Sequence, residues 1–202
     1  MERYEEYLTI KDIACHFPWN KKDYLGNVFA ASGCRVTETN QPQQLDWALI
    51  EIGSRWGINM LPSCKEHSRT SIYQVHCMIL PPMELPKPGD PLFKVGRTIS
   101  FKEDRYNGLP SIILEEGATD SDGHNMARVT YEHAVSYYGY QRDQFFINGD
   151  AGSVVFDRHS AFVGILFAGK EQGGIGYFTP IETVLEDIKR ITGAQDIRIP
   201  FS

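Results

Sequence analysis

Short apolar stretches, separated by turn residues, recur along most of the chain. They have the length of strands rather than helices and are rich in β-branched and aromatic residues. The dipeptides Asn107-Gly108 and Asp122-Gly123 lie between such stretches and are typical of tight turns. The pattern predicts short strands over residues 25–33, 45–52, 72–80, 92–100, 111–115, 129–131, 154–156, 162–167 and 176–178.

A segment near the C-terminus has a helical period instead. Its apolar residues recur at the spacing of a single helix face. They are Ile181, Val184, Leu185, Ile188 and Ile191. Pro180 suits the first turn of such a helix, and Gly193 suits its end. We expect a helix over residues 181–191.

Many short strands followed by one helix predict a mainly β protein built from antiparallel β-barrels, rather than a parallel sheet flanked by helices. Prolines crowd residues 81–91, so this stretch is the best candidate for a linker. We therefore expect a first β-barrel over residues 1–85 and a second β-barrel, together with the helix, over residues 90–202.

Composition narrows the function classes. The 202 residues are 42% hydrophobic and carry a net charge of -6, without a run of lysines or arginines. This balance argues against a nucleic-acid surface. No apolar stretch approaches the roughly 20 residues of a membrane helix, and the acidic N-terminus does not resemble a secretory signal. We expect neither nucleic acid nor membrane as a partner.

The cysteines bear on the cellular setting. Their spacing matches no zinc motif, and the sequence contains no Asn-x-Ser/Thr acceptor for glycosylation. The four are Cys15, Cys34, Cys64 and Cys77. These observations favour free thiols in an intracellular, cytoplasmic setting, with two disulfides as the alternative. No cofactor and no metal are expected.

The candidate chemistry lies in residues 145–156. There the turn Gly149-Asp150-Ala151-Gly152-Ser153 separates an aromatic pair from a β-branched run. Glycines on both sides of the central residue let the backbone bend sharply and turn successive N–H groups into one concavity. Such a turn suits an oxyanion if its central residue is a nucleophile. Ala151 is not one, because a methyl group cannot attack a carbonyl.

This turn resembles the nucleophile loop of chymotrypsin-like (trypsin-like) serine peptidases, Gly-Asp-Ser-Gly-Gly or Gly-Asp-Ser-Gly-Ser. The sequence matches that loop except at Ala151, where the family has its serine. Residues 45–50, Leu-Asp-Trp-Ala-Leu-Ile, resemble the family's Asp-x-Ala-Leu motif. Residues 94–98, Lys-Val-Gly-Arg-Thr, resemble the opening of the second barrel in fungal-type intracellular members, which usually continue with Thr-Gly instead of Ile99-Ser100. The resemblance covers residues 25–193 and implies the chymotrypsin-like fold.

The resemblance also implies roles for single residues. Ala151 takes the nucleophile position, Asp46 orients the catalytic imidazole, and His16 is the histidine that precedes Asp46, as the family order requires. Backbone N–H groups of Gly149 and Ala151 would form the oxyanion hole, with Asp150 as the brace of the loop. Alternatively, Asp46 only caps a strand, and Asp150 is an ordinary turn residue without a role in a site.

The same resemblance implies an uncharged specificity pocket. Its residues would be Phe145, Phe167, Ala168, Gly169, Gly174 and Gly176. Without a carboxylate in it, a basic side chain of the substrate would lose its hydration uncompensated. Small or apolar residues before the cleaved bond are therefore expected. The aromatic members are equally good candidates for the core.

His16 is the weak member of the triad, because fifteen residues hardly supply the strand pair that a first barrel needs before it. The alternatives are a histidine upstream or absent, or another polypeptide that completes the first barrel. Three functions follow. The first is a serine endopeptidase domain acting on peptides or proteins, inactive through a Ser-to-Ala change. The second is a natural pseudopeptidase that binds or regulates, and the third is a structural two-barrel domain.

Overall fold

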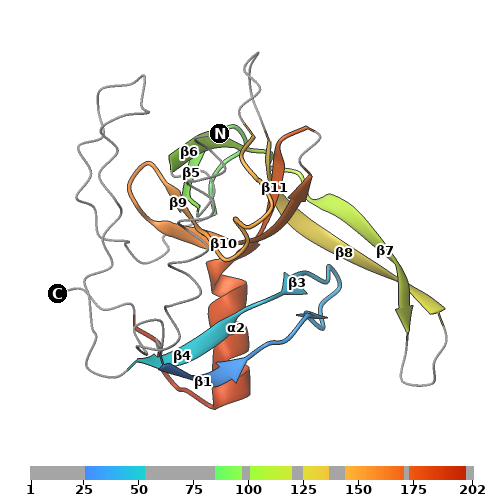
Figure 1. Cartoon of the computed structure of the whole chain (residues 1–202), viewed down its shortest axis with the longest axis vertical. Helices are drawn as coiled ribbons and strands as arrows, with labels where there is room; N and C mark the ends of the chain where they lie inside the picture. The colour runs from blue at the N-terminus through green and yellow to red at the C-terminus, as the bar shows by residue number, and fades with distance from the viewer. Residues whose placement is uncertain are drawn as a thin grey trace, which may run out of the picture.

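A computed structural model describes residues 26–52, 85–96, 101–119, 125–136, 144–170 and 173–198. Strands make up most of this part of the chain, and one helix follows them at its C-terminal end (Figure 1). The predicted mainly β class with a C-terminal helix is therefore confirmed. Predictions for His16, for a strand over 72–80 and for Ile99-Ser100 lie outside the described residues.

The elements have the following bounds. The strands are β1 (Gly26–Ala31), β2 (Arg35–Val36), β3 (Gln44–Leu45), β4 (Ala48–Ile52), β5 (Pro91–Val95), β6 (Phe101–Tyr106), β7 (Ser111–Thr119), β8 (Asn125–Ser136), β9 (Val154–Asp157), β10 (Phe162–Lys170) and β11 (Ile175–Pro180). The helix is α2 (Ile181–Thr192).

In the second half of the described chain, which lies within residues 85–198, the sheet closes into a ring. Antiparallel pairings join β5 to β6, β6 to β8, β8 to β11, β11 to β10, β10 to β9 and β9 back to β5. Six strands of the seven-stranded sheet thus form a closed ring, and β7 pairs only with β8 outside it (Figure 1). Closure removes the unpaired strand edges that an open sheet exposes. This ring stands where the second antiparallel barrel is predicted.

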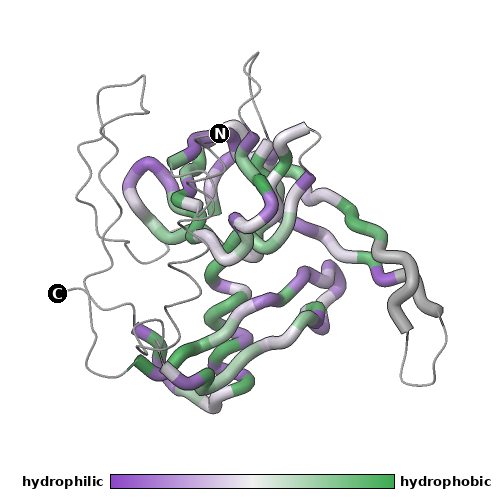
Figure 2. Tube along the Cα trace, viewed as in Figure 1, coloured by the Kyte–Doolittle hydropathy of each residue, from purple (hydrophilic) through white to green (hydrophobic). Residues whose placement is uncertain are grey.

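The ring encloses one hydrophobic core. Hydrophobic residues are frequent along its strands (Figure 2), and β5 and β11 are buried on both faces. The buried cluster consists of Leu92, Tyr106, Val135, Phe145, Phe146, Val155, Val163, Leu166 and Phe178. Two of these residues, Phe145 and Phe146, belong to the segment that leads into the candidate loop.

The first half of the described chain, residues 26–52, contains two small two-stranded sheets. β1 pairs with β4, and β2 pairs with β3, each as a two-stranded antiparallel sheet. No closed first barrel is seen in this part, and residues 1–25 and 53–84 are not described. The division into domains at residues 85–90 accordingly stays a prediction.

Helix α2 joins the two halves. It begins after Pro180 and ends at Gly193, whose left-handed backbone (φ 73°) lets its N–H donate to the Lys189 carbonyl. Its buried face packs in one cluster with Leu45 and Trp47 of the first half. The expected apolar face is largely confirmed, although Ile191 is 38% exposed. Among the described elements, none is a helix with the length and apolar character needed to cross a membrane.

Candidate active site

The candidate loop is a pair of linked turns. Asp150 N–H donates to the Ile147 carbonyl (3.0 Å), and the Ser153 N–H and Oγ donate to the Asp150 carbonyl (3.1 and 2.6 Å). Gly149 (φ 97°) and Gly152 (φ 87°) take left-handed conformations that disfavour a side chain. The predicted role of the two glycines in bending the backbone agrees with these angles.

The loop is tied to β10 on one side only. Gly152 N–H donates to the Leu166 carbonyl (2.7 Å), and Leu166 N–H donates to the Ser153 carbonyl (2.9 Å). Within the described chain, the N–H groups of Gly149 and Ala151 have no hydrogen-bond partner, and both residues are exposed. These two unpaired donors lie on either side of Asp150, where the sequence predicts an oxyanion hole, and that role stays a prediction.

Asp150 is held by Lys94, which belongs to the 94–98 stretch but for which the sequence predicted no role of its own. The Lys94 ammonium donates to Asp150 Oδ2, and both side chains are completely buried. Asp150 Oδ2 also accepts the Ile147 N–H (3.3 Å), and Lys94 lies 5.8 Å from the centre of the Phe145 ring. Burial lowers the pKa of Lys94, whereas the hydrogen bond and charge of Asp150 oppose that shift.

Lys94 could have been suspected from its surroundings. It is flanked by Leu92 and Phe93, which are 0% and 2% exposed, in a strand buried on both faces. A lysine there needs a counter-charge, because an isolated buried ammonium is strongly unfavourable. Gly96 lies so close to the pair that an added Cβ would collide with Asp150 and Lys94. The sequence signal is thus a charged residue inside an apolar strand.

Asp46 lies in the first half, between β3 and β4. Its side chain is exposed, and it makes no hydrogen bond or ion pair with the described residues. The residue after it is firmly held: Trp47 is buried, and its backbone N–H donates to Ser32 Oγ (2.9 Å). Because His16 is not described, the assembly of Asp46 with a histidine stays a prediction.

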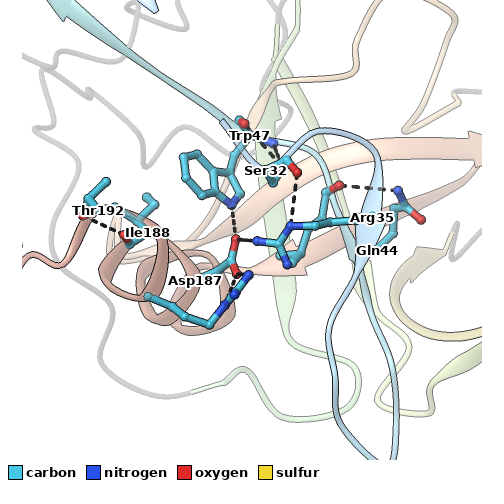
Figure 3. Close-up of polar contacts among 9 residues, drawn as sticks. Ser32, Arg35, Gln44, Trp47, Asp187, Ile188 and Thr192 are labelled. Atoms are coloured by element: carbon cyan, nitrogen blue, oxygen red, sulfur yellow. Dashed lines mark hydrogen bonds and ion pairs between the residues drawn. The ribbon is translucent and has the colours of Figure 1, made fainter. Parts of the chain in front are cut away.

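Trp47 anchors this segment to helix α2 (Figure 3). The indole Nε1–H donates to Asp187 Oδ2 (2.9 Å), and Arg35 donates to the same carboxylate. Arg190 adds two bonds to Asp187 Oδ1 (3.1 and 3.2 Å). Burial would raise the pKa of Asp187, but the bonds from Arg35, Trp47 and Arg190 and the charge of Arg35 hold it below its ordinary value.

The predicted pocket is packed with aromatic rings. Phe145 and Phe146 are 1% and 6% exposed and belong to the core of the ring. An added Cβ on Gly176 would lie 2.9 Å from the Phe145 ring, and one on Gly169 would collide with the Phe146 ring. Phe145, which the sequence predicts for the pocket, lies in the core of the ring. Ala168 and Phe167 are half-buried, and Gly174 is buried.

Adding a methyl group at Gly169 should therefore destabilise the protein. We expect Gly169→Ala to cost about 1–3 kcal/mol, because the Phe146 ring must shift within a packed core. Urea unfolding measures the loss as a lower midpoint. Phe146→Leu supplies the control: combined with Gly169→Ala it should recover part of the loss, which the double-mutant cycle reports. A Gly169→Ala protein as stable as the parent would contradict this packing.

Other features of the described chain do not add to this site. No group of three or more metal-binding side chains is found among the described residues. A cavity of about 340 Å³ lies between the 35–43 segment and α2, and one of about 470 Å³ lies between residues 85–91 and the β9–β10 turn. Neither lining includes a residue of the candidate loop.

Comparison with known proteins gave partial matches. No family model matches the chain, and no curated protein matches it. A glutamic acid specific serine protease is similar over 76% of this chain and 70% of its own, at 12% identity and a TM-score of 0.48. Cellulomonas bogoriensis chymotrypsin matches over 81% and 86%, at 15% identity and a TM-score of 0.46.

A third match is the active form of the Rv3671c protease from M. tuberculosis. It covers 60% of this chain and 51% of that protein, at 14% identity and a TM-score of 0.38. At these identities and TM-scores the likeness assigns neither residues nor activity. These solved structures are proteases, and the fold of this chain resembles theirs in part.

Proposed function

We propose that this chain is a trypsin-like serine endopeptidase domain of the fungal intracellular type, inactive because Ala151 takes the nucleophile position. One observation carries the proposal. The Gly149–Ser153 loop presents two unpaired, exposed N–H groups beside the nucleophile position, and a buried ion pair holds it from behind. Asp150 belongs to this turn and Lys94 to β5, so the ion pair fixes the turn to the ring.

With serine at position 151, the chemistry follows from where charge develops. A histidine would take the hydroxyl proton as the oxygen attacks an amide carbonyl, and Asp46 would stabilise the imidazolium. The N–H groups of Gly149 and residue 151 would bind the oxyanion, an effect of about 2.7–4 kcal/mol per donor. This acyl transfer needs neither metal nor cofactor.

A natural pseudopeptidase is the second candidate. Two observations favour it: alanine stands at position 151, and the core rings of Phe145 and Phe146 pack against the glycines of the expected pocket. Such a module would bind peptides along a groove without cleaving them. The genomic codon for residue 151 separates the two candidates, since serine there supports the enzyme and alanine supports the module.

The direct test is chemical. A serine-directed fluorophosphonate should label the Ala151→Ser protein and leave the Ala151 protein unlabelled. If a well-folded Ala151→Ser protein is not labelled, the enzyme proposal fails and the binding module takes its place.

Cleavage preference should follow the uncharged residues of the expected pocket. In the Ala151→Ser protein we expect small or apolar residues before the cleaved bond, because Phe167 and Ala168 offer no partner to a basic side chain. A peptide library read by mass spectrometry measures this preference. A dominant preference for Lys or Arg would show that the pocket assignment is wrong.

The partners and setting belong to the same proposal. The substrate is a peptide or protein, in an intracellular compartment that keeps thiols such as exposed Cys34 reduced. Val28 and Phe29 on β1 are 64% and 68% exposed. Large apolar side chains in that position support the view that a further polypeptide segment completes the first barrel.

A further inference from the structure

Two buried carboxyl groups hold the short segment that carries Asp46. Glu132 on β8 binds it at Gln44, two residues before Asp46, and Asp187 on α2 binds it at Trp47, one residue after. Both belong to the half of the chain that carries the candidate loop. The segment is thus fastened on each side of Asp46 to the part of the protein that holds Ala151.

Glu132 fixes the backbone of Gln44. Its Oε1 accepts the Gln44 N–H (2.8 Å), and Thr179 Oγ1 donates to the Gln44 carbonyl (2.7 Å). Both polar groups of that residue's backbone are therefore satisfied by side chains of the ring. Glu132 is 0% exposed, and its second oxygen, Oε2, has no hydrogen-bond partner.

The surroundings of Glu132 do not favour an ionised carboxylate. The residue bonded to Glu132 from β3 is Gln44 and the residue opposite it on β7 is Ser111, both uncharged. On its own strand, Thr130 donates to it, and the charged residue on the same face of that strand is Arg128, four positions away. Burial raises the pKa of Glu132, and the bonds from Gln44 and Thr130 oppose this only in part.

Asp187 works in the opposite protonation state. It is 6% exposed and accepts bonds from two guanidinium groups as well as from the Trp47 indole. Its negative charge is what those arginines bind, so protonation would release them. Arg35 itself extends from β2, next to the Asp46 segment, and also donates to the Ser32 carbonyl (3.1 Å).

We propose that Glu132 and Asp187 are positioning residues for Asp46, and that Glu132 holds its segment as the neutral acid while Asp187 holds it as the carboxylate. The role of Asp46 in this statement rests on the proposed function. The holding itself does not, because it concerns the contacts of Gln44 and Trp47.

The signs of the two titrations define a pH window. The contribution of Glu132 is complete below its ordinary value of 4.5 and is lost as the pH rises through its raised pKa in the folded protein. The contribution of Asp187 is complete above its ordinary value of 3.8 and is lost as the pH falls through its lowered pKa. The segment is held by both carboxyl groups only between these limits.

Hydrogen exchange at the Gln44 amide, in the unaltered Ala151 protein, tests the hydrogen bond that the Gln44 N–H donates to Glu132. Protection, corrected for intrinsic exchange, should fall by up to about tenfold for each pH unit between the ordinary value of 4.5 and the raised pKa of Glu132, and should level off above that pKa. In Glu132→Gln, which keeps a neutral acceptor, protection should not change with pH. Asp187→Asn is the matched control and should weaken protection of the Trp47 indole N–H at every pH above the lowered pKa of Asp187. Equal pH dependence in the parent and Glu132→Gln would overturn the proposal.

Two further measurements keep the test decisive. The ¹³C shift of the Glu132 carboxyl in the unaltered protein reports its proton directly, and titration at or below 4.5 would overturn the neutral state even if Glu132→Gln fails to fold. In an active Ala151→Ser background, Asp187→Asn should lower kcat more than it raises KM. An unchanged kcat would show that the contacts of Glu132 and Asp187 are structural only, and would overturn their role in positioning Asp46. An inactive Ala151→Ser protein would contradict the proposed function. The exchange experiment would still test whether Glu132 and Asp187 hold the Asp46 segment.

Discussion

Serine at position 151 is expected to make this protein reactive toward fluorophosphonates. Ala151 lies in a loop whose backbone already has the two left-handed glycines and two N–H groups without a partner among the described residues, which we propose as the oxyanion hole. Residue 151 is exposed, so a hydroxyl group can be added without displacing a neighbour. Because only the nucleophile is missing from the loop, the Ala151→Ser change should restore it without refolding the turn.

Two controls identify the labelled atom and its activation. Ser153→Ala in the Ala151→Ser protein should leave labelling intact, because the Ser153 hydroxyl is engaged with the Asp150 carbonyl (2.6 Å). Asp46→Asn in the same background should reduce turnover by about 10⁴-fold, since the imidazole would lose the group that sets its tautomer. Labelling that survives Asp46→Asn at full rate would contradict the role of Asp46.

Removing the Lys94 ammonium is expected to have the largest effect on stability. Lys94→Met leaves the Asp150 carboxylate buried without its counter-charge, and breaking such a pair costs about 3–5 kcal/mol. Chemical unfolding followed by circular dichroism measures the loss. Without its counter-charge, the Asp150 carboxylate should also pull the loop out of its turns toward solvent, so Lys94→Met should abolish labelling of the Ala151→Ser protein.

A double variant separates the pair's effect on stability from its effect on the loop. Lys94→Met with Asp150→Leu removes both charges, and replacing a buried ion pair by apolar residues is often neutral or stabilising. Stability should then recover, while labelling of the serine form stays absent because Ile147 N–H loses its acceptor. A single Lys94→Met protein that loses less than about 1 kcal/mol would show that the pair does not brace the loop.

Local features of the fold were well predicted from the sequence. Helix α2 follows its apolar period and ends at Gly193, and the turns at Gly149 and Gly152 need the backbone angles that glycine permits. In these cases the residues that decide the conformation are within a few positions of one another. Periodicity and turn chemistry report such short-range preferences directly.

Strand β6 was missed for a physical reason. Its sequence, Phe-Lys-Glu-Asp-Arg-Tyr over residues 101–106, is too charged to be recognised as a strand. Pairing with β5 along its length and with β8 at one end makes it one, because the ring supplies hydrogen bonds that no local pattern announces. The long β7–β8 arm was underestimated likewise, since its extension depends on cross-strand pairs rather than on propensity.

The sequence by itself determined the mainly β class, the terminal helix and the shape of the Gly149–Ser153 loop, because each depends on neighbours along the chain. Only the tertiary structure decided which distant residues bind the Gly149–Ser153 loop and the segment around Asp46. Lys94 and Asp150 are 56 positions apart, Gln44 and Glu132 are 88 apart, and Trp47 and Asp187 are 140 apart. Burial makes each of these polar groups depend on its distant partner, and only the folded chain brings the partners together.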